Sequence, residues 1–295
     1  MESEKDTIQD KSSSGIVMML LASICFALMA AMIKFVRNVP VMEIVFIRSL
    51  PIIIIVPLII RYKRIPLCGN NQPLLFLRCF FSTFGIISYF YTLTLMALTD
   101  AVTIKQLSTF FIIILARIFL KEKITLKQIY IFVFAFVGAL LVVKPGLRLD
   151  ILPAIIGILR AISTAGSYVS VRHLRLTEHP LVIVNYFGLI TGIVSLTVLI
   201  MQRNFVIPDL LNLSVLILNG LLGMIGQIAL TKAYQLAKAN LVSLYLYLQI
   251  IYSTIFGIIV FKEIPDLFII CGAIIIISCG YLNYKFKLDV NRKEE

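Results

Sequence analysis

The sequence predicts an all-α polytopic membrane protein of ten transmembrane helices, arranged as two inverted five-helix repeats. Three observations predict this fold class. Hydrophobic residues make up 60% of the 295 residues and the mean hydropathy is +1.00, whereas soluble domains contain about 45 to 50% apolar residues. The apolar residues gather in ten long runs. A charged motif near the end of the fourth run, Lys121-Glu122, returns after the ninth as Lys262-Glu263.

Each apolar run has about 20 residues, which is enough to cross a hydrocarbon core about 30 Å thick. The predicted spans are 15–36, 41–60, 73–95, 97–120, 126–143, 151–171, 180–201, 211–233, 239–261 and 267–284. They divide the chain into a polar tail, a first repeat, a second repeat and a basic tail, at 1–14, 15–146, 151–284 and 285–295.

The two repeats are related by a constant offset in sequence. Gly85 corresponds to Gly226 and Leu95 to Leu236, at the spacing that also relates the two Lys-Glu motifs. Because each repeat holds an odd number of spans, the second repeat enters the membrane from the opposite face. Inverted repeats are a signature of secondary transporters.

The formal net charge of +12 is distributed in a way that indicates membrane topology. With the N-terminus inside, most Lys and Arg residues of the loops and tails fall on inner segments, as do Lys63, Arg64 and Lys127. Basic residues near spans stay cytoplasmic during insertion. We therefore expect two cytoplasmic termini and a lipid bilayer as partner, and no nucleic-acid partner.

Polar residues fall on single faces of several predicted spans. In the third span, Arg78, Ser82, Gly85, Tyr89 and Thr92 lie within an arc of about 80° at 100° per residue. A buried polar group without a partner costs a few kcal/mol. We expect this stripe to face protein or water and not lipid.

Similar faces in the fourth, sixth and ninth spans complete a set of predicted substrate-binding residues. They are Arg78, Tyr89, Lys105, Gln106, Arg160, Tyr245, Gln249 and Tyr252. Together they would line a central cavity with cationic, amide and aromatic groups. Ser, Thr and Gly on the same faces are expected to serve helix packing. For the three cations a functional role is favoured, because charges are rarely retained at membrane depth without a functional or paired role.

Four other charged residues are predicted to have structural or gating roles. They are Glu43, Arg48, Glu122 and Glu263. Glu43 and Arg48 lie about 140° apart around one helix, so each needs a partner elsewhere, and Lys34 or Arg37 is a candidate for Glu43. The two repeated glutamates are predicted to tie the end of each span to the next loop.

Lines of small residues predict faces where helices approach closely. They are Ser23, Ala27 and Ala30 in the first span, Asn185, Gly188 and Gly192 in the seventh, and Gly223 and Gly226 in the eighth.

The sequence contains no pattern for catalysis or metal binding. The five cysteines show no CxxC spacing, and His173 and His179 lack the HExxH spacing of a zinc site. We therefore expect no catalytic residue, metal or cofactor, and no enzymatic activity. A polytopic membrane enzyme and a channel are the less favoured alternatives to a carrier.

Several short motifs together resemble the drug/metabolite transporter superfamily with two EamA-type repeats. They are Phe46-Ile47-Arg48, Lys121-Glu122 with Thr125, Lys144-Pro145-Gly146 and Lys262-Glu263-Ile264-Pro265. The resemblance covers nearly the whole chain. It implies a solute carrier that works by alternating access without ATP.

Within that superfamily the chain looks most like the S-adenosylmethionine uptake transporters of obligate intracellular bacteria. This resemblance implies uptake of S-adenosylmethionine across a bacterial inner membrane, in exchange for S-adenosylhomocysteine. The predicted residues suit that substrate, since a sulfonium would bind tyrosine faces by cation–π attraction and a carboxylate would pair with an arginine or lysine. The alternative is an exporter of amino acids, drugs or other metabolites.

Overall fold

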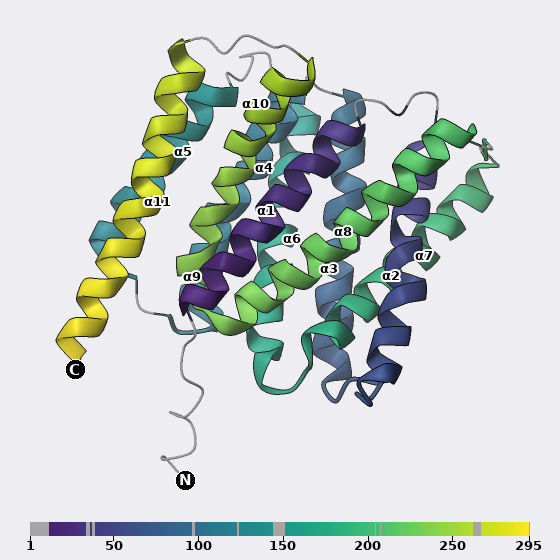
Figure 1. Ribbon diagram of the computed structural model, residues 1–295, viewed down its shortest axis with the longest axis horizontal. Coiled ribbons are helices and arrows are strands. Elements are labelled where there is room, and N and C mark those ends of the chain that lie inside the picture. The colour runs from purple at the N-terminus through teal and green to yellow at the C-terminus, as the bar shows by residue number, and fades with distance from the viewer. Residues whose placement is uncertain are drawn as a thin grey trace.

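The computed structural model describes residues 12–294 apart from 34–35, 37–38, 96–97, 123, 144–150, 204, 207 and 262–266. The side chains of 89–106, 142–154, 261 and 286–294 also lie outside the described part. The described residues form a single bundle of helices (Figure 1). The first helix begins and the last helix ends on the same side of this bundle (Figure 1).

The helices follow the predicted spans closely. They are α1 (Ser12–Ile33), α2 (Val41–Tyr62), α3 (Gln72–Leu95), α4 (Leu98–Phe119), α5 (Leu126–Val143), α6 (Ile151–His173), η1 (Leu174–Leu176), α7 (Pro180–Gln202), α8 (Leu210–Leu236), α9 (Ala239–Val242), η2 (Ser243–Tyr247), α10 (Leu248–Phe261) and α11 (Leu267–Glu294). α11 continues through the segment predicted to be a basic tail.

Six apolar stretches within the described residues are long enough to cross a membrane. They are Ser12–Ile33, Val41–Tyr62, Pro180–Gln202, Leu210–Leu236, Ala239–Val260 and Leu267–Lys285. Shorter apolar segments lie at Gln72–Ser88, Leu107–Phe119 and Leu126–Leu141. The part of the chain that is described is thus an all-helical, multi-pass membrane protein, while the full count of ten spans stays a prediction.

The ninth predicted span differs from the continuous α-helix that the sequence predicts. α9 is a single turn, and the buried 3₁₀ segment η2 separates it from α10. A 3₁₀-helix has three residues per turn instead of 3.6. Tyr245, which lies in η2, therefore does not continue the line of Gln249 and Tyr252 on α10. The predicted stripe through this span is wrong at its first member.

Helix contacts follow a pattern that is preserved when the two halves are exchanged. α1 packs against α8, and its counterpart α6 packs against α3. In the same way α1 contacts α10 while α6 contacts α4, and α2 contacts α8 while α7 contacts α3. α2 and α7 pair with each other, as do α5 and α11. Each half thus packs mainly through helices of the other half.

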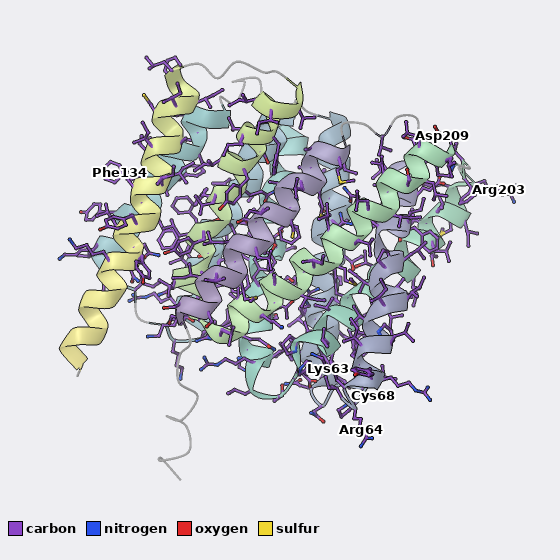
Figure 2. The ribbon with its side chains drawn as sticks, viewed as in Figure 1. Lys63, Arg64, Cys68, Phe134, Arg203 and Asp209 are labelled. Atoms are coloured by element: carbon purple, nitrogen blue, oxygen red, sulfur yellow. The ribbon has the colours of Figure 1, made fainter. Side chains whose placement is uncertain are left out.

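The ends of α2 and α7 show how the halves are oriented. Arg64 follows the end of α2 with φ 55°, and Arg203 ends α7 with φ 49°. Left-handed backbone is uncommon outside glycine, so this shared conformation marks equivalent positions. Figure 2 shows the two arginines at opposite ends of the molecule. The helices α2 and α7 therefore run in opposite directions.

Two helices of the second half begin with side-chain caps. Asp209 accepts a hydrogen bond from the backbone N–H of Asn212 at 3.3 Å and starts α8. His179 accepts one from the N–H of Leu181 through Nδ1 at 3.2 Å and starts α7. Partial burial, with the positive charges of Lys63 and Lys232, lowers the pKa of His179. The neutral ring that results keeps Nδ1 available as an acceptor.

Glycines set the closest helix approaches. A Cβ on Gly188 would overlap the side chain of Ile52 on α2, and a Cβ on Gly226 would lie 2.9 Å from the ring of Phe26 on α1. Gly223 faces Met29 on α1 in the same way. The predicted close-packing faces of the seventh and eighth spans are confirmed, because their glycines admit the side chains of neighbouring helices.

Candidate functional site

The described part of the polar stripe on α3 faces other helices. Nη1 of Arg78 donates a hydrogen bond to Oγ of Ser82 at 3.0 Å, and that hydroxyl lies 2.5 Å from Oγ of Ser167 on α6. Nε of Arg160, also on α6, donates to the carbonyl oxygen of Gly85 at 3.3 Å. Two of the predicted cations therefore meet at the interface of α3 and α6, one from each half of the chain.

Arg78 is enclosed by residues from four helices. Only 1% of its surface is exposed. Its guanidinium carbon lies 4.5 Å from the ring centroid of Phe187 on α7, and Nη2 lies 3.5 Å from Oε1 of Gln227 on α8. Its Nε has no hydrogen-bond partner among the described residues. Among the described residues, no carboxylate forms an ion pair with this guanidinium.

Two tyrosines extend the site from α6 to α8. The rings of Tyr168 and Tyr234 stack with centroids 5.0 Å apart and an interplanar angle of 29°. Tyr168 is half-buried, and its phenol interacts electrostatically with both Arg78 and Arg160. The hydroxyl of Tyr234 is buried, and no described residue forms a hydrogen bond with it. Cationic and aromatic groups therefore lie side by side where α3, α6, α7 and α8 meet, and we call this group the central polar cluster.

The other predicted binding residues are distributed differently. Tyr245 is buried and donates a hydrogen bond from its hydroxyl to the carbonyl of Gly280 on α11 at 3.3 Å. Gln249 and Tyr252 are half-buried on α10. The side chains of Tyr89, Lys105 and Gln106 lie outside the described part of the structure. Whether these six bind substrate stays a prediction.

Glu122 has the role of a tie, although its partners differ from the expected next loop. It accepts backbone hydrogen bonds from Ala239 at 3.0 Å and Asn240 at 3.1 Å, and it lies 3.6 Å from Nε of Arg172. Nη1 of Arg172 in turn donates to the carbonyl of Gln235 at 3.0 Å. The end of α4 is thereby tied to α6, to the end of α8 and to the start of α9. Its predicted counterpart, Glu263, lies outside the described residues.

Two more carboxylates form a matched pair of ties at opposite ends of the bundle. Glu43, fully buried on α2, accepts a hydrogen bond from the N–H of Val206 at 3.1 Å. Glu178, just before α7, accepts one from the N–H of Asn71. Each of these two contacts joins one half of the chain to the other. Arg48 is half-buried on α2.

Some residues of the site were not predicted from the sequence. They are Phe187, Gln227, Tyr168, Tyr234, Arg172 and Glu178. The glutamine is a polar residue in the middle of an apolar span directly after Gly226, which is the counterpart of Gly85, and this repeat relationship could have indicated it. The described residues hold no group of three metal-ligating side chains.

Comparison with known protein families identifies the family of this chain. The EamA-like transporter family matches the chain twice, at residues 13–144 and 151–284. The chain belongs to the EamA-like transporter family. The two matches coincide with the two predicted repeats, and they identify a transporter of the drug/metabolite superfamily and not a membrane enzyme.

Several transporters are similar to most of this chain. The pseudopaline exporter CntI of Pseudomonas aeruginosa strain PAO1 is 30% identical over 92% of this chain and 95% of its own length. The S-adenosylmethionine uptake transporter of Rickettsia conorii is 29% identical over 82% of each chain. The mouse solute carrier family 35 member G1 is 29% identical over 89% of this chain and 76% of its own.

The fold also occurs in a solved structure. A crystal structure with 14% sequence identity superposes with a TM-score of 0.83 and covers 96% of this chain and 99% of its own. At this identity the similarity establishes the fold alone.

Proposed function

We propose that this EamA-like protein is a secondary transporter that takes up S-adenosylmethionine across a bacterial inner membrane, in exchange for S-adenosylhomocysteine. Ten spans would form two inverted repeats with both termini in the cytoplasm. Substrate would bind between the repeats and reach each side in turn by alternating access, as in other transporters of inverted-repeat architecture.

The observation that carries the proposal is the exchange of helix contacts between the halves. α3 packs on α6 and α1 on α8, so each main interface joins one half to the other. A relative motion of the halves changes both interfaces together. The opposite placement of Arg64 and Arg203 (Figure 2) supports the inverted orientation, and the shared side of the α1 start and the α11 end (Figure 1) supports an even number of spans.

The choice of substrate rests on similarity and on the chemistry of the central polar cluster. Rickettsial relatives are named as S-adenosylmethionine uptake transporters. An arginine and stacked tyrosines suit a molecule that carries a carboxylate, an aromatic base and a sulfonium, through ion pairing, stacking and cation–π attraction.

Export of a small metabolite is the second candidate function. It is favoured by the similarity to the pseudopaline exporter CntI, which extends over nearly the full length of both chains. Sequence and fold do not fix the direction of net flux, because the gradients of the transported molecules do.

The decisive experiment is uptake of labelled S-adenosylmethionine by purified protein in liposomes, with and without internal S-adenosylhomocysteine. We expect saturable uptake that internal S-adenosylhomocysteine stimulates. Empty liposomes and liposomes with an unrelated ten-span carrier are the controls. Absence of protein-dependent uptake under both conditions would reject this substrate.

A further inference from the structure

Arg78 carries a charge that the described protein does not neutralise. Of its guanidinium N–H groups, Nη1 makes a 3.0 Å hydrogen bond to Ser82, Nη2 a long 3.5 Å contact to Gln227, and Nε none. Both acceptors are neutral oxygens. Its further interactions, with the face of Phe187, the thiol of Cys79 and the phenol of Tyr168, involve no carboxylate.

A buried guanidinium in this setting is costly. Removal of an ion from water carries a penalty of several kcal/mol, and arginine does not escape it by losing its proton. A bidentate carboxylate is the partner that matches the geometry of a guanidinium best. The central polar cluster therefore has the electrostatic requirement for an anion next to Arg78.

Three buried carboxylates among the described residues are engaged elsewhere. Glu122 is bound to Arg172 and to the start of α9, and Glu178 is bound to the N–H of Asn71. Glu43 binds a loop at the opposite end of the bundle from Glu178. None of these three is free to pair with Arg78 without breaking a tie between helices.

The repeat relationship indicates that helix packing does not require this cation. At the offset that relates Gly85 to Gly226, the residue equivalent to Arg78 is Asn219. Asn219 is fully buried, is neutral and donates a hydrogen bond to the carbonyl of Met29 at 2.9 Å. The same place in the fold therefore accepts a neutral side chain, and the charge belongs to the first half alone.

Two hydrogen-bond partners of Arg78 are less enclosed than Arg78 itself. Ser82 and Gln227 are half-buried, in contrast to Arg78 itself. The long contact with Gln227 is the weakest one around the guanidinium, and its displacement exposes Nη2 and Nε. One of the hydroxyls of Ser82 and Ser167 retains a proton to donate after their mutual hydrogen bond is formed.

We propose that Arg78 is the subsite for a carboxylate of the transported molecule. Its guanidinium binds the two carboxylate oxygens. The ring of Phe187 packs against the guanidinium, and Gln227 moves aside. The substrate class is then small molecules with a free carboxylate, which deepens the proposed function and rests on it. A neutral or decarboxylated analogue lacks the group that offsets the buried charge.

The test compares S-adenosylmethionine with its decarboxylated analogue on purified full-length protein. Binding is measured by the ligand-induced rise in Tm and by competition with labelled S-adenosylmethionine. We expect the intact ligand to bind wild type about 10- to 100-fold more tightly, the factor that corresponds to a charged hydrogen bond. Arg78→Met should remove this difference by weakening only the intact ligand, and Arg78→Lys should retain part of it.

Stability without ligand separates a binding role from a structural one. Because Arg78→Met removes an uncompensated buried charge, its ligand-free Tm should equal or exceed that of wild type. Arg61→Met, at an exposed arginine, is the matched control and should change neither property. A lower ligand-free Tm for Arg78→Met, or equal weakening of both ligands, would overturn the proposal.

Failure of the substrate is distinguishable from failure of the subsite. If wild-type protein neither binds nor transports S-adenosylmethionine, the proposed function fails in its substrate. The same Tm comparison is then made with the common amino acids and their carboxamides. The subsite is supported if wild type, but not Arg78→Met, binds the free amino acids more tightly than their carboxamides. It is rejected if wild type shows no such preference for any compound in the set.

Discussion

The carboxylate of Glu122 lies 3.6 Å from Nε of Arg172, and both side chains are almost completely buried. The first comes from the end of α4 in one half and the second from α6 in the other. Because the same carboxylate also binds the first N–H groups of α9, one residue fixes three helices at one end of the bundle. A transporter that opens at this end has to break or move this contact.

Glu122→Gln should therefore destabilise the protein. The amide keeps the shape and one acceptor but loses the charge opposite Arg172, so we expect a loss of about 1 to 3 kcal/mol, as for a hydrogen bond to a charged group. Tm in detergent is the measurement. Asp209→Asn, at an exposed helix cap, is the control, with a loss below about 1 kcal/mol. Equal effects of the two substitutions would contradict a special role for Glu122.

A second prediction concerns topology. Phe205 is exposed near the end of α7 and Cys68 is exposed near the start of α3. With the N-terminus inside, Phe205→Cys should react with a membrane-impermeant maleimide in intact cells, whereas Cys68 should react only after permeabilisation. Mass spectrometry measures the labelling of each cysteine separately, so Cys68 serves as an internal control. Reaction of Cys68 in intact cells would show that the orientation is opposite to the predicted one.

The third prediction tests the interface of α2 and α7. A Cβ on Gly188 would overlap Ile52, whose branched side chain has little freedom to move. Gly188→Ala should lower stability by about 1 to 3 kcal/mol, the usual effect of overpacking. Gly280→Ala is the matched control, because its new Cβ would meet nothing closer than 3.9 Å. If both variants have the same Tm as wild type, α2 and α7 are packed less closely than described.

The fourth prediction addresses recognition of the sulfonium. If Tyr252 binds the cation through its ring, Tyr252→Leu should reduce a preference for S-adenosylmethionine over neutral S-adenosylhomocysteine. A cation–π contact of roughly 0.5 to 2 kcal/mol corresponds to a preference of about twofold to thirtyfold. Inhibition of labelled uptake by each compound measures it. Equal loss of both ligands would show that the ring supplies shape only.

The helices and the duplication of the fold could be predicted because both leave a pattern in the sequence. Runs of apolar residues set the helices, and the repeated Lys-Glu motif and matched glycines revealed the duplication. The stripe through Arg78, Ser82 and Gly85 also placed these residues correctly against protein, since burial of a charge in lipid is costly at any position. The helices and their polar faces follow from neighbours within one helix, and the duplication follows from repeated residues at one fixed offset.

The rest depends on contacts between helices, which periodicity does not encode. The 3₁₀ segment around Tyr245 breaks the helical register, and no glycine or proline within Ser243–Tyr247 marks it. Gln227 and Phe187 reach Arg78 from α8 and α7, and the order of helices around α3 could not be read from spacing. For the same reason Glu122 was expected to hold the next loop and instead holds the start of α9.

The exchange of partners between the halves has a consequence for how the chain is made. As α3 leaves the ribosome, its polar face has no α6 to receive it, and α1 has no α8. Arg78 and its neighbours on α3 therefore lack their partners on α6 until more than half of the protein has been synthesised. A chain that ends after α5 therefore lacks the helices that enclose Arg78 in the complete fold.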